Sequence, residues 1–390
     1  MLYRKMGSTN LDVSVLGFGA MRLPMMGTGN ELDSFDPKTP VDEEEATKMV
    51  EHAIENGVNY FDTAYIYHTG KSETFLGKAL QNHRSKVRIA TKLPTWNLKG
   101  KADFDRIFDK QLEKLQTDHI DFYLIHGLDR STWNSLREMG VLDFLDRLRA
   151  DRRILHAGFS FHDALNVFRE IVDAYDWGMC MVQYNYYDRA YQAGTEGVAY
   201  AASKGIGVVA MEPLRGGKLA GRIPPEVQAL WDSARPRRSP VEWALRWAWN
   251  NARISTVLSG MSNLEQVKEN VRLAGEALPD SLSSEELGLI DRVRAAYRKM
   301  LKVDCTGCGY CMPCPYDVNI PHNFTSYNDT YMFEDTLAVN RVFYNKMTPP
   351  GQKASACTEC RECVEKCPQK LDIPELLKDV DKRLGTDEAR

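Results

Sequence analysis

Residues 87–126 read VRIATKLPTWNLKGKADFDRIFDKQLEKLQTDHIDFYLIH, and this stretch contains one complete repeat of the pattern that decides the fold. An apolar run at Val87–Lys92 is followed by an amphipathic pattern near residues 103–117, in which apolar side chains recur every three or four positions. A second apolar run follows at Ile120–His126. The stretch therefore predicts a strand, a helix and a further strand, which is the unit of a parallel sheet.

The same alternation continues through residues 1–300. After a short hairpin at Tyr3–Val13, eight apolar runs have the length of strands: Val15–Gly19, Val58–Asp62, Val87–Lys92, Ile120–His126, Leu155–Ser160, Cys180–Tyr184, Gly207–Met211 and Thr256–Gly260. Helical patterns lie near residues 42–56, 72–82, 103–117, 142–150, 163–175, 195–204, 239–250 and 263–275. Eight alternating units close most simply as a (β/α)8 barrel. A doubly wound open sheet is the alternative, but no Gly-x-Gly-x-x-Gly follows the first strand.

The cysteines are concentrated near the end of the chain. Eight of the nine lie in two runs that each end in Cys-Pro, namely Cys305-x2-Cys308-x2-Cys311-x2-Cys314-Pro315 and Cys357-x2-Cys360-x2-Cys363-x3-Cys367-Pro368. This spacing is typical of paired four-iron four-sulfur clusters, in which three cysteines of a run bind one cluster and the cysteine before proline binds the other. We therefore expect crossed ligation of two clusters. One would take Cys305, Cys308, Cys311 and Cys367, and the other Cys357, Cys360, Cys363 and Cys314.

Two other uses of the cysteines are open. Disulfides need an oxidising compartment, and zinc usually takes two separated CxxC pairs for each ion, so both fit this arrangement less well. The first run has two residues rather than three before its last cysteine, so the ligand role of Cys314 needs a direct test. Cys180 stands apart in an apolar run and is expected to be a buried core thiol. The cysteine distribution predicts a barrel domain at residues 1–300 and a small cluster-binding domain at 301–390.

Composition limits the remaining possibilities. The 390 residues carry a formal net charge of −4, no polybasic block and no apolar run of the length needed to span a membrane. We expect no membrane or nucleic-acid partner. The opening MLYRKMGSTN lacks the apolar stretch of a secretory signal, so a reducing cytoplasm is the expected location.

Polar residues end several predicted strands, where a barrel carries its chemistry. Asp62, Lys92 and His126 end the second, third and fourth strands, and Tyr67 follows Asp62 closely. Each of them alone could be structural. Together they describe a proton-donating phenol, because a phenol is a weak acid at neutral pH unless a nearby cation stabilises its phenolate. Lys92 could supply that charge, Asp62 could hold the lysine, and His126 could orient a carbonyl oxygen, which indicates carbonyl reduction.

Further motifs support this interpretation. Together with the four polar residues, they show that the sequence resembles the aldo-keto reductases. The resemblance covers residues 1–300 and rests on these segments: Gly17-Phe18-Gly19-Ala20-Met21, Phe61-Asp62-Thr63-Ala64-x-x-Tyr67, Ser72-Glu73, Ala90-Thr91-Lys92, Leu124-Ile125-His126, Gly158-Phe159-Ser160, Val182-Gln183-Tyr184-Asn185 and Met211-Glu212-Pro213-Leu214-x-Gly216-Gly217. With the cysteine runs, the chain is similar to the branch that carries a C-terminal, mainly helical ferredoxin-like domain. The resemblance implies a TIM barrel followed by that domain.

The resemblance also implies roles for individual residues. Tyr67 would be the general acid, tuned by Lys92 and Asp62, with His126 orienting the carbonyl. Coenzyme contacts would come from Gly19, Ala20, Met21, Asp62, Ser160, Gln183, Met211, Pro213, Leu214, Gly216 and Lys218, and the adenosine end would meet Ser259, Gly260, Gln266 and Asn270. Family members that prefer NADPH commonly carry a lysine and an arginine where this chain has Gly260 and Gln266, so NADH is favoured over NADPH.

Three functions remain open from sequence. The first is an NAD(P)H-dependent reductase of a small aldehyde or ketone, acting in reverse on an alcohol, that also carries two clusters. The second is an electron-transfer protein that passes electrons between nicotinamide and a partner protein through the clusters. A hydride carries two electrons and a cluster accepts one, so that route would need a mediator such as flavin, for which no motif is present. The third is a redox sensor that binds nucleotide without turnover.

Overall fold

A computed structural model describes the chain except for residues 28–38, 97, 222, 334–335 and 386–390. The described residues group into two compact units. The first consists of residues 1–216 and 242–283, and the second consists of residues 217–241 and 284–390. The segment 217–241 thus groups with the cysteine-rich end of the chain, although it precedes the last barrel strand. The boundary at residue 300 between the barrel domain and the cluster-binding domain stays a prediction.

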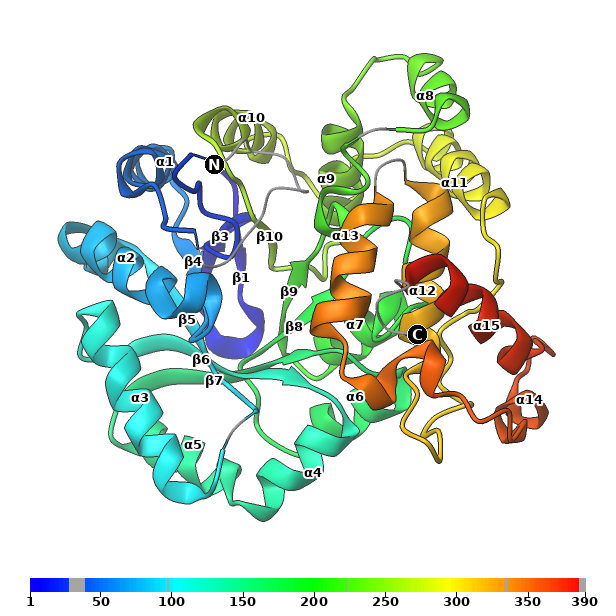
Figure 1. Cartoon of the computed structure of the whole chain (residues 1–390). Helices are drawn as coiled ribbons and strands as arrows, with labels where there is room; N and C mark the ends of the chain where they lie inside the picture. Colours follow the sequence, from blue (N-terminus) through cyan, green and yellow to red (C-terminus); the bar gives the residue numbers. More distant parts are fainter. Residues whose placement is uncertain (28–38, 97, 222, 334–335, 386–390) are drawn as a thin grey trace. The chain divides into compact units, whose positions relative to one another are not determined.

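The first unit contains a closed barrel of eight parallel strands (Figure 1), which confirms the predicted fold class. Its strands are β3 (Leu16–Gly19), β4 (Tyr60–Asp62), β5 (Arg88–Leu93), β6 (Ile120–Leu128), β7 (Ile154–Phe161), β8 (Met179–Gln183), β9 (Gly207–Met211) and β10 (Thr256–Ser259). Each strand pairs with the next along the chain, and β10 pairs with β3 to close the ring, with Val257 opposite Leu16.

A short antiparallel hairpin covers one end of this barrel. It consists of β1 (Tyr3–Lys5) and β2 (Asp12–Ser14). Met6 and Val13 pack against the inward-facing side chains of the strands, among them Phe122 and Leu124 of β6. The amide of Ser8 bonds to the carbonyl of Gly205, two residues before β9 begins. The hairpin therefore closes the N-terminal end of the strands and leaves the C-terminal end for chemistry.

Helices alternate with the strands and bury one apolar face each. In α1, the buried residues Ala46, Met49, Val50 and Ala53 recur at helical spacing, and Asp42 caps the first turn by accepting from the amide of Glu45. The helices of this unit are α1 (Glu43–Glu55), α2 (Lys71–Leu80), α3 (Lys101–Leu115), α4 (Arg130–Glu138), α5 (Val141–Ala150), α6 (Leu165–Asp173), α7 (Gly194–Ser203), α9 (Pro240–Asn250) and α10 (Leu264–Ala274).

Helix α4 lies between the predicted strand at Ile120–His126 and the helical pattern near residues 142–150, where the sequence predicted no element. Its start is fixed by a capping box, in which Asp129 accepts from the amide of Thr132 and the Thr132 hydroxyl accepts from the amide of Asp129. Trp133 and Leu136 are its buried residues. Only two of its nine residues are buried and the segment as a whole is polar, so its composition is that of a loop, which is why it was missed.

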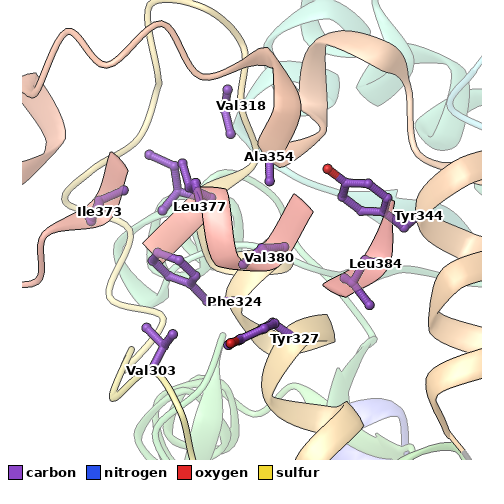
Figure 2. Close-up of a cluster of buried hydrophobic side chains, with 11 residues drawn as sticks. Val303, Val318, Phe324, Tyr327, Tyr344, Ala354, Ile373, Leu377, Val380 and Leu384 are labelled. Atoms are coloured by element: carbon purple, nitrogen blue, oxygen red, sulfur yellow. The ribbon is translucent and has the colours of Figure 1, made fainter. Parts of the chain in front are cut away.

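The second unit is mainly helical, as predicted. It contains α8 (Pro225–Asp232), α11 (Ser284–Lys299), α12 (Ile320–Met332), α13 (Thr336–Val342), a π-helical turn (Phe343–Met347), α14 (Glu362–Lys366) and α15 (Ile373–Leu384). Figure 2 shows a core of its buried side chains, in which Phe324 of α12 lies near Leu377 and Val380 of α15. Among the described residues, no helix has the length and apolar character needed to span a bilayer.

Candidate active site and cluster-binding cysteines

An ion pair between neighbouring strands lies at the centre of the candidate active site. Asp62 ends β4, and Lys92 lies near the end of β5, which pairs with β4. The Lys92 Nζ donates to Asp62 Oδ1 at 2.6 Å and to the Thr63 carbonyl at 2.7 Å, and both charged side chains are 1% exposed. Burial raises the pKa of Asp62, and Lys92 opposes this shift. Burial would lower the pKa of Lys92, but Asp62 and Tyr67 outweigh it, so the pKa is raised and the lysine is an ammonium.

Tyr67 and His126 complete the group that the sequence predicted. The Lys92 Nζ lies 3.5 Å from the Tyr67 Oη, and the Tyr67 and His126 rings meet edge to face with centroids 6.0 Å apart. Burial raises the pKa of Tyr67, and Lys92 works in the opposite direction. Burial, with Lys92 and His162, lowers the pKa of His126 well below its ordinary value. The group is therefore a neutral phenol and a neutral imidazole beside a buried ammonium.

The backbone after Tyr67 turns sharply. His68 and Thr69 have φ values of 51° and 53°, in the left-handed region that such residues seldom adopt. The buried His68 Nε2 accepts from the amide of Leu23 at 3.2 Å, which holds the turn in place. Sequence reasoning missed His68, because its partner lies 45 residues away in the chain.

A buried network lies behind Lys92. Glu73 of α2 accepts from the Thr91 hydroxyl and from the Gln111 amide, both at 2.7 Å, and pairs with Lys114 at 3.2 Å. The Gln111 amide also donates to the Lys92 carbonyl at 3.0 Å. The network ties α2 and α3 to the strand end that carries Lys92. The motif Ser72-Glu73 was the sequence signal, but its partners were not readable from it.

Ser160, Gln183 and Met211 lie at the ends of β7, β8 and β9, and Gln183 is opposite Met211 in the ladder. The Ser160 Oγ accepts from the amide of Gly127 at 2.8 Å, and Gln183 Nε2 donates to Asp188 at 2.8 Å. Three of the expected coenzyme contacts thus lie on neighbouring strand ends.

The loop after β9 carries the next group of expected coenzyme contacts: Pro213, Leu214, Gly216 and Lys218. Gly216 has a φ of 68°, which glycine adopts freely. Lys218 groups with the second unit, where its ammonium is bonded to Asp329 of α12. The sequence predicts Lys218 as a coenzyme contact, and in the structure its partner is this carboxylate, which is 2% exposed.

The residues expected at the adenosine end lie after β10 and along α10. Asn270 donates to the Ser259 hydroxyl at 3.1 Å, and the Gln266 carbonyl oxygen accepts from the amide of Ser262 at 2.9 Å. On the first strand end, the amide of Ala20 bonds to the Asp62 carbonyl at 2.8 Å, which places Gly19, Ala20 and Met21 beside Asp62.

Arg22 was missed by sequence reasoning. A Cβ added to Gly260 would lie 3.6 Å from three carbons of the Arg22 side chain, and one added to Gly216 would lie 3.5 Å from its Nη2. Burial lowers the pKa of this guanidinium, and Glu212 opposes the shift. The sequence signal that could have indicated Arg22 is its positive charge just after the first predicted strand. Arg22 lies against Gly260, one of the two positions on which the expected preference for NADH rests.

The eight cysteines of the two runs line two hollows. One hollow is lined by Cys305, Cys308, Cys311 and Cys367, together with Ile320 and Phe324. The other is lined by Cys314, Cys357, Cys360 and Cys363, and Cys311 borders it as well. These are the two sets expected from the spacing. Burial raises the pKa of Cys305, with Cys308 and Cys367 adding to the shift, and burial raises the pKa of Cys363, with Cys357, Cys360 and Cys314 adding to it.

The arrangement of the sulfur atoms suits a cluster. Within the described residues, no three His, Cys, Asp or Glu side chains converge as the ligands of a single metal ion would. Each hollow is lined by four cysteines of one expected set, and thiolates are the ligands that hold iron–sulfur clusters, so the residues present fit such clusters. The amide of Gly307 donates to the Cys305 Sγ at 3.4 Å, a contact of the kind that tunes cluster sulfur.

Comparisons with known proteins agree with this geometry. Residues 15–295 match the aldo/keto reductase family, and residues 304–371 match the 4Fe-4S dicluster domain. The chain is 29% identical over 314 residues to an L-galactose dehydrogenase of Arabidopsis thaliana, covering 74% of this chain and 93% of the relative. It is 27% identical over 304 residues to the uncharacterized oxidoreductase YqkF of Bacillus subtilis, covering 70% of this chain and 91% of the relative.

Solved structures show the same relationship. The aldo-keto reductase AKR11C1 from Bacillus halodurans, in its holo form, superimposes with a TM-score of 0.62 at 30% identity, covering 75% of this chain and 96% of that one. The chain is thus an oxidoreductase that belongs to the aldo/keto reductase family and carries a C-terminal 4Fe-4S dicluster domain.

Proposed function

We propose that the barrel reduces a small aldehyde or ketone with NAD(P)H and that Tyr67 donates the proton. One observation carries this proposal: the Lys92 ammonium lies 3.5 Å from the Tyr67 hydroxyl and is held by a 2.6 Å bond to buried Asp62. When bound, the nicotinamide coenzyme supplies the hydride. Charge develops on the carbonyl oxygen as the hydride arrives, and a positioned donor beside a cation stabilises that charge.

Each residue of the group has a distinct part in this reaction. Tyr67 donates its proton to the carbonyl oxygen, and Lys92 stabilises the phenolate that remains. Asp62 keeps the lysine charged and in place. The neutral His126 donates its ring N–H to the same carbonyl oxygen, and its Nδ1 is a buried atom without a hydrogen-bond partner within the described residues. That free position supports a role in orienting the substrate.

The proposed coenzyme contacts follow the strand ends and the loop after β9. Ser160, Gln183 and Met211 would meet the nicotinamide, and the remaining expected contacts would meet the pyrophosphate and adenosine. The sequence favours NADH through Gly260 and Gln266. Arg22 places a guanidinium beside Gly260, where it could meet a 2′-phosphate, so both coenzymes belong in the binding assay.

The test is Tyr67→Phe, with Tyr65→Phe as a matched control from the same loop. We expect Tyr67→Phe to lower kcat for carbonyl reduction by about 10²-fold to 10⁴-fold, while coenzyme affinity and cluster absorption are unchanged. The substrate panel contains simple aldehydes and ketones with NAD(P)H, and L-galactose is tested in the oxidation direction with NAD(P)⁺ because of the relative described above. Turnover by Tyr67→Phe at the wild-type rate would exclude this function.

We further propose that the dicluster domain holds two four-iron clusters with crossed ligation, as the two hollows support. Direct electron exchange with nicotinamide is unfavourable, since a hydride carries two electrons and a cluster accepts one. We therefore expect NADH or NADPH alone to leave cluster absorption unchanged in oxygen-free protein. Rapid bleaching would favour the electron-transfer function through a bound mediator. A cytoplasmic location and an electron-transfer partner stay predictions.

A further inference from the structure

Asp188, which follows β8, is a buried carboxylate that the proposed reaction does not use. Asp188 is 9% exposed. Its Oδ2 accepts from Gln183 Nε2 at 2.8 Å, from Asn185 Nδ2 at 3.3 Å and from Arg215 Nε at 2.9 Å. A buried carboxylate is stable when donors surround it in this way. The end of β8 and the loop after β9 thus meet at one oxygen atom.

Asp188 itself is held on a tight turn. The Asn185 Oδ1 accepts from the amide of Tyr187 at 3.1 Å and from the amide of Asp188 at 2.8 Å. The carboxylate therefore has a defined position relative to β8. A group held this firmly can orient the side chains that bind it.

The bond between Gln183 and Asp188 decides which way the Gln183 amide faces. A carboxylate only accepts hydrogen bonds, so the Gln183 NH₂ must point toward Asp188 and its Oε1 must point away. Gln183 then offers an acceptor. Ser160 has the opposite polarity, because its Oγ already accepts from the amide of Gly127 and the hydroxyl keeps a hydrogen to donate.

These polarities match a nicotinamide carboxamide, which donates through its NH₂ group and accepts through its carbonyl oxygen. The same carboxylate holds Arg215, whose guanidinium lies 5.2 Å from the Tyr187 ring and whose backbone has a φ of 50° in the loop after β9. Asp188 thus connects the nicotinamide end of the site with the loop at the pyrophosphate end.

We propose that Asp188 is a positioning residue that sets the hydrogen-bond polarity of the carboxamide subsite through Gln183. The carboxamide NH₂ donates to Gln183 Oε1, and the carboxamide oxygen accepts from Ser160. The inference rests on the proposed function, because it requires that the barrel bind a nicotinamide coenzyme.

The experiment compares Asp188→Asn with the wild-type holoprotein and with Asp176→Asn, an exposed aspartate of the same unit. The probes are NADH and its reduced 3-acetylpyridine analogue, in which a methyl group replaces the carboxamide NH₂. The measurement is the Kd of each probe. We expect wild type and Asp176→Asn to bind NADH about fivefold to twentyfold more tightly than the analogue, which is the effect of one hydrogen bond. In Asp188→Asn the preference should fall to about twofold or less, because an asparagine can donate as well as accept and no longer forces the Gln183 orientation.

A structural role alone would weaken both probes equally and leave their ratio unchanged, so an unchanged ratio in Asp188→Asn overturns the inference. Gln183→Met serves as the second variant if Asp188→Asn does not fold. It should also lose the preference for NADH, and retention of that preference overturns the inference as well. The two proposals fail differently: a wild-type protein that binds neither NADH nor NADPH removes the proposed function itself.

Discussion

Reactive side chains are held by different contacts in the barrel site and in the cysteine hollows. In the barrel, Lys92 is bonded to a carboxylate and to a backbone carbonyl, and its strand end is tied to α2 and α3 through Gln111 and Glu73. In the second unit, Cys363 lies on the short helix α14 and the other seven cysteines of the two runs lie on irregular segments, around a core of eleven buried residues. The barrel site is organised by the fold alone. The cysteine site depends much more on what it binds.

The largest expected effect is the removal of iron. Chelation under reducing conditions should unfold the cysteine-rich unit, because its small core gives limited stability without metal. The barrel should keep its thermal transition. Six of the seven tryptophans, namely Trp96, Trp133, Trp177, Trp243, Trp247 and Trp249, lie in the first unit and report on it by fluorescence. Limited trypsin cleavage followed by mass spectrometry reports on the second unit, and full protection of residues beyond 300 after chelation would contradict the comparison.

The next effect concerns one cluster. Cys314→Ala should lose the cluster that is assigned to Cys314, Cys357, Cys360 and Cys363, and the iron content should fall by about half. Cys180→Ala is the control, because Cys180 is buried in β8 and separate from both hollows. Iron analysis and paramagnetic resonance of the reduced protein measure the loss. Wild-type iron content in Cys314→Ala would remove Cys314 from the ligand set.

A smaller effect is expected for one ion pair of the barrel. Lys92→Met should lower the free energy of unfolding by about 3–5 kcal/mol, because it leaves the Asp62 carboxylate buried without a partner. Lys78→Met is the control, and loss of its exposed pair with Glu43 should cost about 1 kcal/mol or less. Urea denaturation measures the free energy of unfolding of both variants. Equal losses would show that burial of the Lys92–Asp62 pair does not add to its effect on stability.

The same variant has a defined pH dependence. Burial already raises the pKa of Asp62, and removing Lys92 raises it further. The folded Lys92→Met protein therefore binds a proton that the unfolded chain releases at a lower pH, so its stability should fall as the pH rises from the ordinary aspartate pKa through the folded one. The free energy of unfolding of Lys92→Met is expected to approach that of wild type as the pH falls. A difference that grows toward acid pH would contradict this prediction.

The smallest expected effect is on a proton equilibrium. Because the pKa of His126 is held well below its ordinary value, the wild-type pH profile of kcat/KM should show no inflection from this residue near pH ~6.5. The His126 contribution to stability is present above that pH and is lost as the pH falls, since the unfolded chain then takes up the proton. An inflection near pH ~6.5 that disappears in His126→Gln would contradict this prediction.

The success of sequence reasoning follows from where its signals lie. The strands and most helices were readable because period and composition are properties of neighbouring residues. The four polar residues at the strand ends were readable because parallel strands bring their C-terminal ends together. Helix α4 was missed because it buries so little. The partners of His68, Arg22 and Asp188 were missed because each contact joins separate elements of the barrel.

The sequence by itself determined the βα repeat, the barrel and the two cysteine sets, because all of these depend on spacing along the chain. Only the tertiary structure decided which partner each charge takes. Lys218 pairs with Asp329, more than a hundred residues away, and Arg215 pairs with Asp188 rather than standing free in its loop. A charge chooses its partner by distance and burial after folding. Neither quantity is carried by any local pattern of residues.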